Sequence, residues 1–199
     1  MIYVVATGAL DILEEIPVAE IMIPDYPLGR TPTFDKIAVL AAEKNIPIRR
    51  LSLGDWGAWP GNVEWEVFNP PREAASSSAG KSALVLRIAR DENAILMMAS
   101  SDPEVEDAIF SQPLEPSARI LVAADHGSRK SCSTNWLDIV QPDHVILSAG
   151  KNNRFGLPSG DVMKRLETAE IPFFRTDRQG DIRIMWGDHD YAIESSRER

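Results

Sequence analysis

Two polar, glycine-containing segments hold the residues of this chain that could do chemistry. The first is Asp125 to Ser128 (Asp-His-Gly-Ser), and the second is Gly150 to Gly156, one predicted helix and one predicted strand later. Each follows an apolar segment typical of a strand, and loops at the carboxyl ends of strands carry much of the chemistry of α/β proteins. Asp125 and His126 could bind a metal, move a proton, or only satisfy backbone groups in a tight turn. The residue types alone leave these roles open.

The second segment offers a different kind of site. Glycine and asparagine tolerate the positive φ that lets successive backbone N–H groups point at an anion, although an ordinary loop is an equal alternative. Basic side chains lie within and near it, while Asp177 lies in a later polar turn. We therefore take Asp125 and His126 as the candidate catalytic and metal-binding pair. The candidate ligand-binding residues are Ser128, Arg129, Lys151, Asn152, Asn153, Arg154 and Asp177.

Composition narrows the class of protein. The chain has 199 residues, 44% of them hydrophobic, which predicts one domain over 1–190 followed by a polar tail over 191–199. A net charge of −9 argues against a broad phosphate-binding surface but permits a local basic patch. A single cysteine, Cys132, excludes an internal disulfide and a cysteine-based zinc cage. No apolar segment is long enough to span a bilayer, so we expect a soluble, cytoplasmic chain.

Strands and helices alternate along the sequence. Hairpins mixed with strand-helix-strand crossovers favour an α/β (α+β) protein with layered sheets over a purely parallel sheet. Tryptophans at 56, 59 and 65 lie among glycines in a segment whose later part, 63–67, alternates as a half-buried strand does. The predicted helices are 10–16, 34–44, one ending near 110, 134–140 and 161–167. The predicted strands are 2–5, 20–23, 46–51, 63–67, 83–89, 94–99, 120–123, 144–147, 173–175 and 181–186.

The order and spacing of these motifs resemble a known family. The segments 122–128, 133–142, 145–156, 162–166 and 174–180 are similar to the C-terminal hydrolase domain of ComEC-type DNA-uptake proteins, within the metallo-β-lactamase superfamily. The likeness is detailed from 119 to 184 and looser back to 8–10. It implies an αββα sandwich with a site at its edge and metal-dependent phosphodiester hydrolysis. In ComEC-type members it implies degradation of one DNA strand during uptake.

The chain departs from the family at the positions of the metal ligands. Residues 1–6 stand where the family has a His- and Asp-rich motif, and 98–100 stand where it has a Thr-Gly-Asp turn. Asp125-His126 replaces paired histidines, and Leu157 and Ser159 replace the histidines that flank a proline. The family's first β-hairpin is also missing, because the chain begins where that hairpin should already have ended.

These departures lead to one prediction and two alternatives. We predict a metallo-β-lactamase-like αββα sandwich that lacks the first β-hairpin and is a pseudo-hydrolase, with Asp125 and His126 vestigial and no cofactor. The first alternative is an active metal-dependent hydrolase or nuclease linked to DNA uptake. It would use zinc or manganese, with missing ligands supplied from upstream or by a partner chain. The second is a structural or protein-interaction module that uses 54–65, with Trp56 and Trp59 exposed. Nucleic acid is the partner that the resemblance implies.

Overall fold

The computed structural model describes residues 8–25, 32–72, 81–187 and 190–197. The strand predicted over 2–5 lies outside these residues. Within them the helices are α1 (Ala9–Glu15), α2 (Pro32–Glu43), α3 (Glu104–Phe110), α4 (Thr134–Val140), α5 (Gly160–Thr168) and α6 (Thr176–Gln179), with a short turn, η1 (Ala124–His126). The strands are β1 (Ile21–Pro24), β2 (Ile48–Leu51), β3 (Trp56–Trp59), β4 (Val63–Asn69), β5 (Val85–Arg90), β6 (Asn93–Met97), β7 (Ile120–Val122), β8 (His144–Leu147), β9 (Phe173–Arg175), β10 (Ile182–Trp186) and β11 (Tyr191–Ser195).

A seven-stranded mixed sheet forms the centre of the fold, in the order β3-β4-β5-β6-β7-β8-β9. The strands β3 to β6 are antiparallel, whereas β6 to β9 are parallel. Each parallel pair is joined through a helix, α3, α4 or α5, because parallel neighbours need a crossover connection. The loops after β6, β7, β8 and β9 therefore meet at one edge of the sheet.

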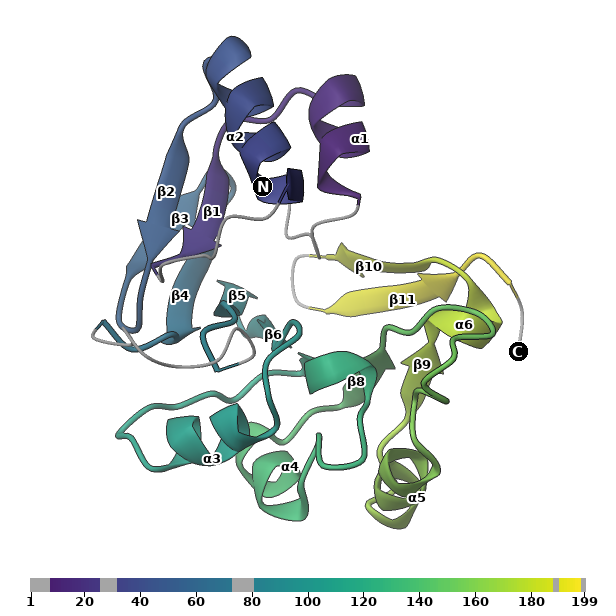
Figure 1. Cartoon of the computed structure of the whole chain (residues 1–199). Coiled ribbons are helices and arrows are strands. Elements are labelled where there is room, and N and C mark those ends of the chain that lie inside the picture. The colour runs from purple at the N-terminus through teal and green to yellow at the C-terminus, as the bar shows by residue number, and fades with distance from the viewer. Residues whose placement is uncertain (1–7, 26–31, 73–80, 188–189, 198–199) are drawn as a thin grey trace.

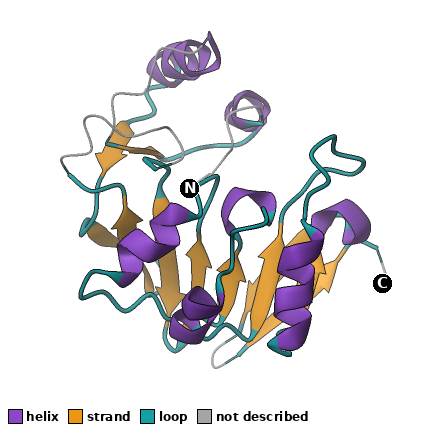
Figure 2. Cartoon of the chain, turned by 60° about the horizontal axis from the view of Figure 1, so that its bottom comes forward, coloured by secondary structure: helices purple, strands orange, loops and turns teal. Residues whose placement is uncertain are grey.

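Four layers stack in the order helix, sheet, sheet, helix. Figure 1 shows α3, α4 and α5 at the bottom and α1 and α2 at the top, with β1-β2 next to the β3-β4 end of the large sheet and β10-β11 above β8 and β9. Figure 2 looks onto the large sheet from the side that carries helices. The main core lies between that face and α3, α4 and α5, and includes Leu121, Val145, Trp136 and Leu166. A second core lies between β1-β2 and the large sheet. The predicted αββα layering is confirmed.

The C-terminal residues differ from the predicted polar tail. Tyr191–Ser195 forms β11 and pairs antiparallel with β10. Tyr191 and Ile193 are half-buried while Ala192 and Glu194 are exposed, so the segment has the period of two that a strand needs. The Tyr191 hydroxyl lies 2.7 Å from His144 Nδ1, and the Arg119 guanidinium lies 4.6 Å from the Tyr191 ring centre. These contacts across the sheets hold the hairpin in place.

No helix within the described residues has the length and apolar composition that crossing a membrane requires.

Candidate functional site

Four loops converge at the carboxyl ends of β6 to β9, and hydrogen bonds join each loop to the next. The Asp125 backbone N–H donates to the Ala99 carbonyl at 3.1 Å, which ties the loop after β7 to the loop after β6. His126 Nδ1 lies 2.7 Å from the Ser148 carbonyl, which joins the loops after β7 and β8. The Ala149 N–H donates to Thr176 Oγ1 at 2.9 Å, which adds the start of α6, directly after β9. The carboxyl edge of a parallel sheet is the usual place for a ligand.

The turn after β7 adopts a strained backbone. Asp125, His126 and Gly127 follow one another with φ of 42°, 56° and 76°, all in the left-handed region. For residues other than glycine this region costs about 1–2 kcal/mol each. Glycine is required at 127 also because a Cβ there would lie 3.0 Å from Leu147 Cδ2 and 3.0 Å from Pro158 Cβ. Backbone strain of this kind concentrates at functional sites, where the surrounding structure maintains it.

His126 is oriented for chemistry by its contact with Ser148. Because a carbonyl oxygen only accepts hydrogen bonds, Nδ1 carries the proton in this geometry and Nε2 is left as the acceptor or metal-binding nitrogen. No group of three or more His, Cys, Asp or Glu side chains that could hold a metal ion occurs in the part of the chain that the structure describes. A zinc site needs three or four protein ligands. Asp125 and His126 alone do not fit a resident zinc or manganese ion.

The Ser128 side chain adds an unsatisfied group to this turn. Its Oγ is buried and forms no hydrogen bond with the described residues. The Ser128 backbone, in contrast, is bonded on both sides: its N–H donates to the Asp125 carbonyl at 3.0 Å, and its carbonyl accepts from Ser131 Oγ at 2.8 Å. A buried hydroxyl without a partner is uncommon because it gives up its hydrogen bonds to water.

A buried carboxylate holds the segment that follows the turn. Glu106 on α3 is 2% exposed and accepts hydrogen bonds from the N–H groups of Cys132 at 2.7 Å and Ser133 at 3.0 Å. Burial raises the pKa of Glu106, while these two N–H groups act in the opposite direction. On the other side, Arg165 Nη1 donates to the Ser131 carbonyl at 2.6 Å. The loop between β7 and α4 is therefore fixed by groups from α3 and α5.

In the loop after β8, one predicted residue is hydrogen-bonded within the loop and the others are exposed to solvent. The Asn153 side chain donates to the carbonyls of Gly150 at 2.9 Å and Leu157 at 2.6 Å, and accepts from the Leu157 N–H at 2.9 Å. These bonds occupy both ends of the Asn153 amide. Lys151 and Arg154 are exposed, as is Asn152. Of the residues predicted here, Asn153 has a structural role and the other three face solvent.

Phe155, in the same loop, was not among the residues predicted to bind a ligand. Its side chain is 69% exposed, and the Arg154 guanidinium carbon lies 4.8 Å from its ring centre. The sequence signal was an aromatic residue between a basic residue and a glycine in a polar loop. An exposed aromatic ring next to free cations is a surface on which nucleobases stack.

Two predicted residues have their charges neutralised nearby. Arg129 Nε lies 3.0 Å from Asp161 Oδ2, with both side chains exposed. Asp177 accepts two hydrogen bonds from Arg175, at 3.0 Å and 2.7 Å, and both side chains are largely buried. Lys151 and Arg154, in contrast, form no ion pair with the described residues. Among the basic residues predicted for the site, these two are the ones without an ion-pair partner in the described part of the chain.

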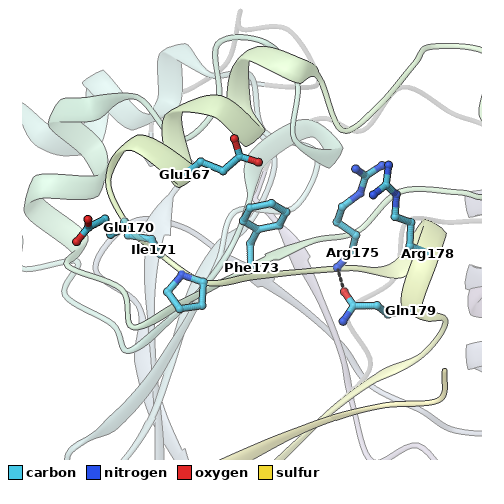
Figure 3. A pocket seen from close by; sticks show the side chains of 8 residues that line it. Glu167, Glu170, Ile171, Phe173, Arg175, Arg178 and Gln179 are labelled. Atoms are coloured by element: carbon cyan, nitrogen blue, oxygen red, sulfur yellow. Dashed lines mark hydrogen bonds between the residues drawn. The ribbon is translucent and has the colours of Figure 1, made fainter. Parts of the chain in front are cut away.

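One pocket lies outside the predicted site. It has a volume of about 520 Å³ and lies among α5, β9 and α6, as Figure 3 shows. Its eight lining residues include none of the residues predicted for binding or catalysis. They are Glu167, Glu170, Ile171, Pro172, Phe173, Arg175, Arg178 and Gln179.

Comparison with known proteins gives related sequences. No family model matches the chain. ComE operon protein 3 of Bacillus subtilis (strain 168) is 26% identical over 155 residues, which is 78% of this chain and 20% of that protein. Competence protein ComA of Neisseria gonorrhoeae is 28% identical over 130 residues, 65% of this chain and 18% of that protein. Recombination protein 2 of Haemophilus influenzae is 26% identical over 145 residues, 73% of this chain and 18% of that protein.

The chain thus spans about a fifth of the length of these relatives. Among solved structures, a mutant of CmlA beta-hydroxylase superposes with a TM-score of 0.47 at 9% identity, covering 78% of this chain and 38% of that one. The predicted resemblance to competence proteins is confirmed at the level of sequence similarity.

Proposed function

We propose that this chain is a ComEC-like domain of metallo-β-lactamase type that binds single-stranded nucleic acid at the carboxyl edge of its parallel strands without hydrolysing it. Its similarity to competence proteins supports nucleic acid as the ligand class. The observation that carries the proposal is the loop after β8, which exposes two cations, Lys151 and Arg154, and the aromatic ring of Phe155 beside Arg154. Cations that contact phosphates and rings that stack on bases are the two components of sequence-independent single-strand binding.

The ligand set supports binding over hydrolysis. A hydrolytic metal ion lowers the pKa of a bound water and neutralises charge on the phosphoryl group. Asp125 and His126 supply two ligands where three or four are needed, and the pair therefore lacks the means to retain such an ion tightly. In the proposed role their turn shapes the binding edge, since His126 fixes the loop after β8 through the Ser148 carbonyl.

The salt dependence of binding tests the proposal. We would measure the affinity for a fluorescein-labelled dT20 oligonucleotide by fluorescence anisotropy between 50 and 200 mM salt. Each phosphate contact on a single strand contributes about 0.7 to the slope of log affinity against log salt. The double variant Lys151→Ala/Arg154→Ala should therefore reduce the slope by about 1.4. Phe155→Ala should weaken binding by about 1–3 kcal/mol without changing the slope, because stacking releases no counterions.

Controls separate local contacts from net charge. The double variant Lys36→Ala/Arg183→Ala removes the same charge from exposed positions on α2 and β10, and should leave the slope unchanged. Arg129→Ala should have a smaller effect than either residue of the β8 loop, because Asp161 already neutralises Arg129. Equal slopes for the wild type and the Lys151/Arg154 variant would disprove the binding surface. Cleavage of the oligonucleotide with Zn²⁺ or Mn²⁺, abolished by His126→Ala, would show an active hydrolase instead.

A further inference from the structure

A second surface lies at the opposite edge of the large sheet, at β3. This strand is the last in the order of the sheet, and no strand pairs with its outer edge in the part of the chain that the structure describes. Natural edge strands are usually protected by lysine, proline or a bulge, because their free N–H and C=O groups attract other strands. The strand β3 is short, with four residues, and its sequence Trp-Gly-Ala-Trp contains no lysine or proline.

Trp56 stands on this edge as a large uncovered ring. It is 75% exposed, the most exposed large hydrophobic side chain described. Trp59 of the same strand behaves differently: it is half-buried, and its ring lies 6.1 Å from that of Trp65 in the second core. The exposure expected of an interaction module thus occurs at Trp56 but not at Trp59. Trp56 and Trp59 therefore point to opposite faces of the sheet. Trp59 faces the second core, and Trp56 faces away from it.

Acidic side chains accompany Trp56 on this face. Trp56 lies opposite Glu66 on β4, and Glu66 lies opposite Arg87 on β5, so the three residues form a row across the strands. They line a hollow of about 230 Å³ together with Gly57, Glu64 and Trp65. The Arg87 Nε is engaged with the Ser117 carbonyl at 2.8 Å. Neither Glu64 nor Glu66 forms an ion pair or hydrogen bond with the described residues. Two carboxylates and one guanidinium, that of Arg87, line the hollow, so its lining is net negative.

Gly57 lies against the Trp65 ring, on the face of the sheet that carries the second core. A Cβ at this position would lie 2.5 Å from the Trp65 ring, closer than any real contact permits. Glycine therefore allows the Trp65 ring to pass directly beneath the β3 backbone. Gly57 and Ala58 themselves add little side-chain volume to β3 between its two tryptophans.

From this arrangement we infer that β3 is a docking edge for an extended segment of a partner protein that carries lysine or arginine. The partner strand pairs with the free edge of β3, as in β-strand addition. A basic side chain on the same face stacks its cation on the Trp56 ring and pairs with Glu66 and Glu64. Main-chain pairing supplies affinity, and the cation selects basic partners over acidic ones.

A designed peptide tests this inference. The probe is a labelled heptapeptide, Thr-Val-Lys-Val-Lys-Val-Thr, with blocked ends, and its matched control replaces both lysines by glutamate. A third peptide keeps the lysines but is N-methylated at alternate backbone positions, which removes the strand-pairing donors. We expect the wild type to bind the lysine peptide and to discriminate at least tenfold against the other two. Trp56→Ala and Glu64→Gln/Glu66→Gln should each reduce affinity for the lysine peptide about five- to tenfold.

The controls make the result decisive. Phe110→Ala removes another exposed aromatic ring, 59% exposed on α3, and should not change peptide binding. Lys151→Ala/Arg154→Ala should also leave it unchanged, so this surface and the nucleic-acid surface can fail separately. Absence of binding up to 1 mM, or equal binding of the lysine and glutamate peptides, would overturn the inference. So would a concentration-dependent dimer that Trp56→Ala dissociates, because it would assign the edge to a second copy of this chain.

Discussion

Replacing Asp125 by glycine is expected to stabilise the protein. Asp125 has φ of 42°, and its side chain forms no hydrogen bond or ion pair with the described residues. Relief of left-handed strain is worth about 1–2 kcal/mol, whereas the added freedom of glycine in the unfolded chain costs about 0.4–1 kcal/mol. The backbone bonds to Ala99 and Ser128 are retained, because glycine keeps the same N–H and C=O groups. The net expectation is a gain between zero and about 1.6 kcal/mol, centred near 0.8 kcal/mol.

Urea unfolding measures this difference directly. Asp125→Gly should shift the midpoint upward with an unchanged slope, which shows that stability and not compactness has changed. Asp125→Ala should be no more stable than the wild type, because alanine tolerates the left-handed region poorly. As a matched control, Asp138→Gly on the exposed face of α4 should be less stable by about 0.5 kcal/mol, because glycine weakens a helix interior. If Asp125→Gly were no more stable than Asp125→Ala, the turn would not be strained as described.

Three other substitutions test the supports of the site. Gly127→Ala should destabilise the protein by about 2 kcal/mol in urea unfolding, because a Cβ meets Leu147 and Pro158 and φ is 76°; an unchanged midpoint would contradict this. The pKa of Glu106 is higher in the folded protein than its ordinary value of 4.5. The protonated side chain therefore contributes fully to the free energy of unfolding below pH 4.5, and this contribution is lost as the pH rises through the raised pKa. Glu106→Gln should remove that decline from a pH series of unfolding free energies, and an unaltered pH profile would refute it. Asn153→Ala removes three side-chain hydrogen bonds and should speed amide exchange in the loop after β8, while exchange in β4 stays as in the wild type.

Much of the fold follows from local sequence patterns. The bounds of α4, β8 and β9 were predicted to the residue, because Ser133 caps α4 and apolar segments bounded by turns define the two strands. In contrast, β3 and β11 were not predicted as strands. Each is short, and each depends on a neighbour for its hydrogen bonds: β3 on β4, and β11 on β10. Pairing partners of this kind are not encoded in the pattern of a single segment.

The candidate site was predictable as a set of loops but not as a set of available side chains. Motif order indicated which loops follow the strands β7 and β8, and the structure shows that His126 of the first loop contacts the Ser148 carbonyl of the second. Whether a charged side chain in these loops forms an ion pair depends on the residues that surround it in the folded protein. Arg129 finds Asp161 and Asp177 finds Arg175, while Lys151 and Arg154 find no ion-pair partner among the described residues. Which of these charges are paired depends on side chains from other helices and strands. The spacing of residues along the sequence does not give the positions of those side chains.

The sequence by itself determined the layered α/β class and the positions of the polar turns, because residue types and their periodicity are sufficient for those conclusions. Only the tertiary structure decided which of the polar residues act together. It placed Asp125 and His126 in a left-handed turn held by Ala99 and Ser148, exposed Phe155, and left Trp56 uncovered at an open strand edge. The physical reason is that strain, exposure and charge pairing arise from contacts between residues far apart in the chain.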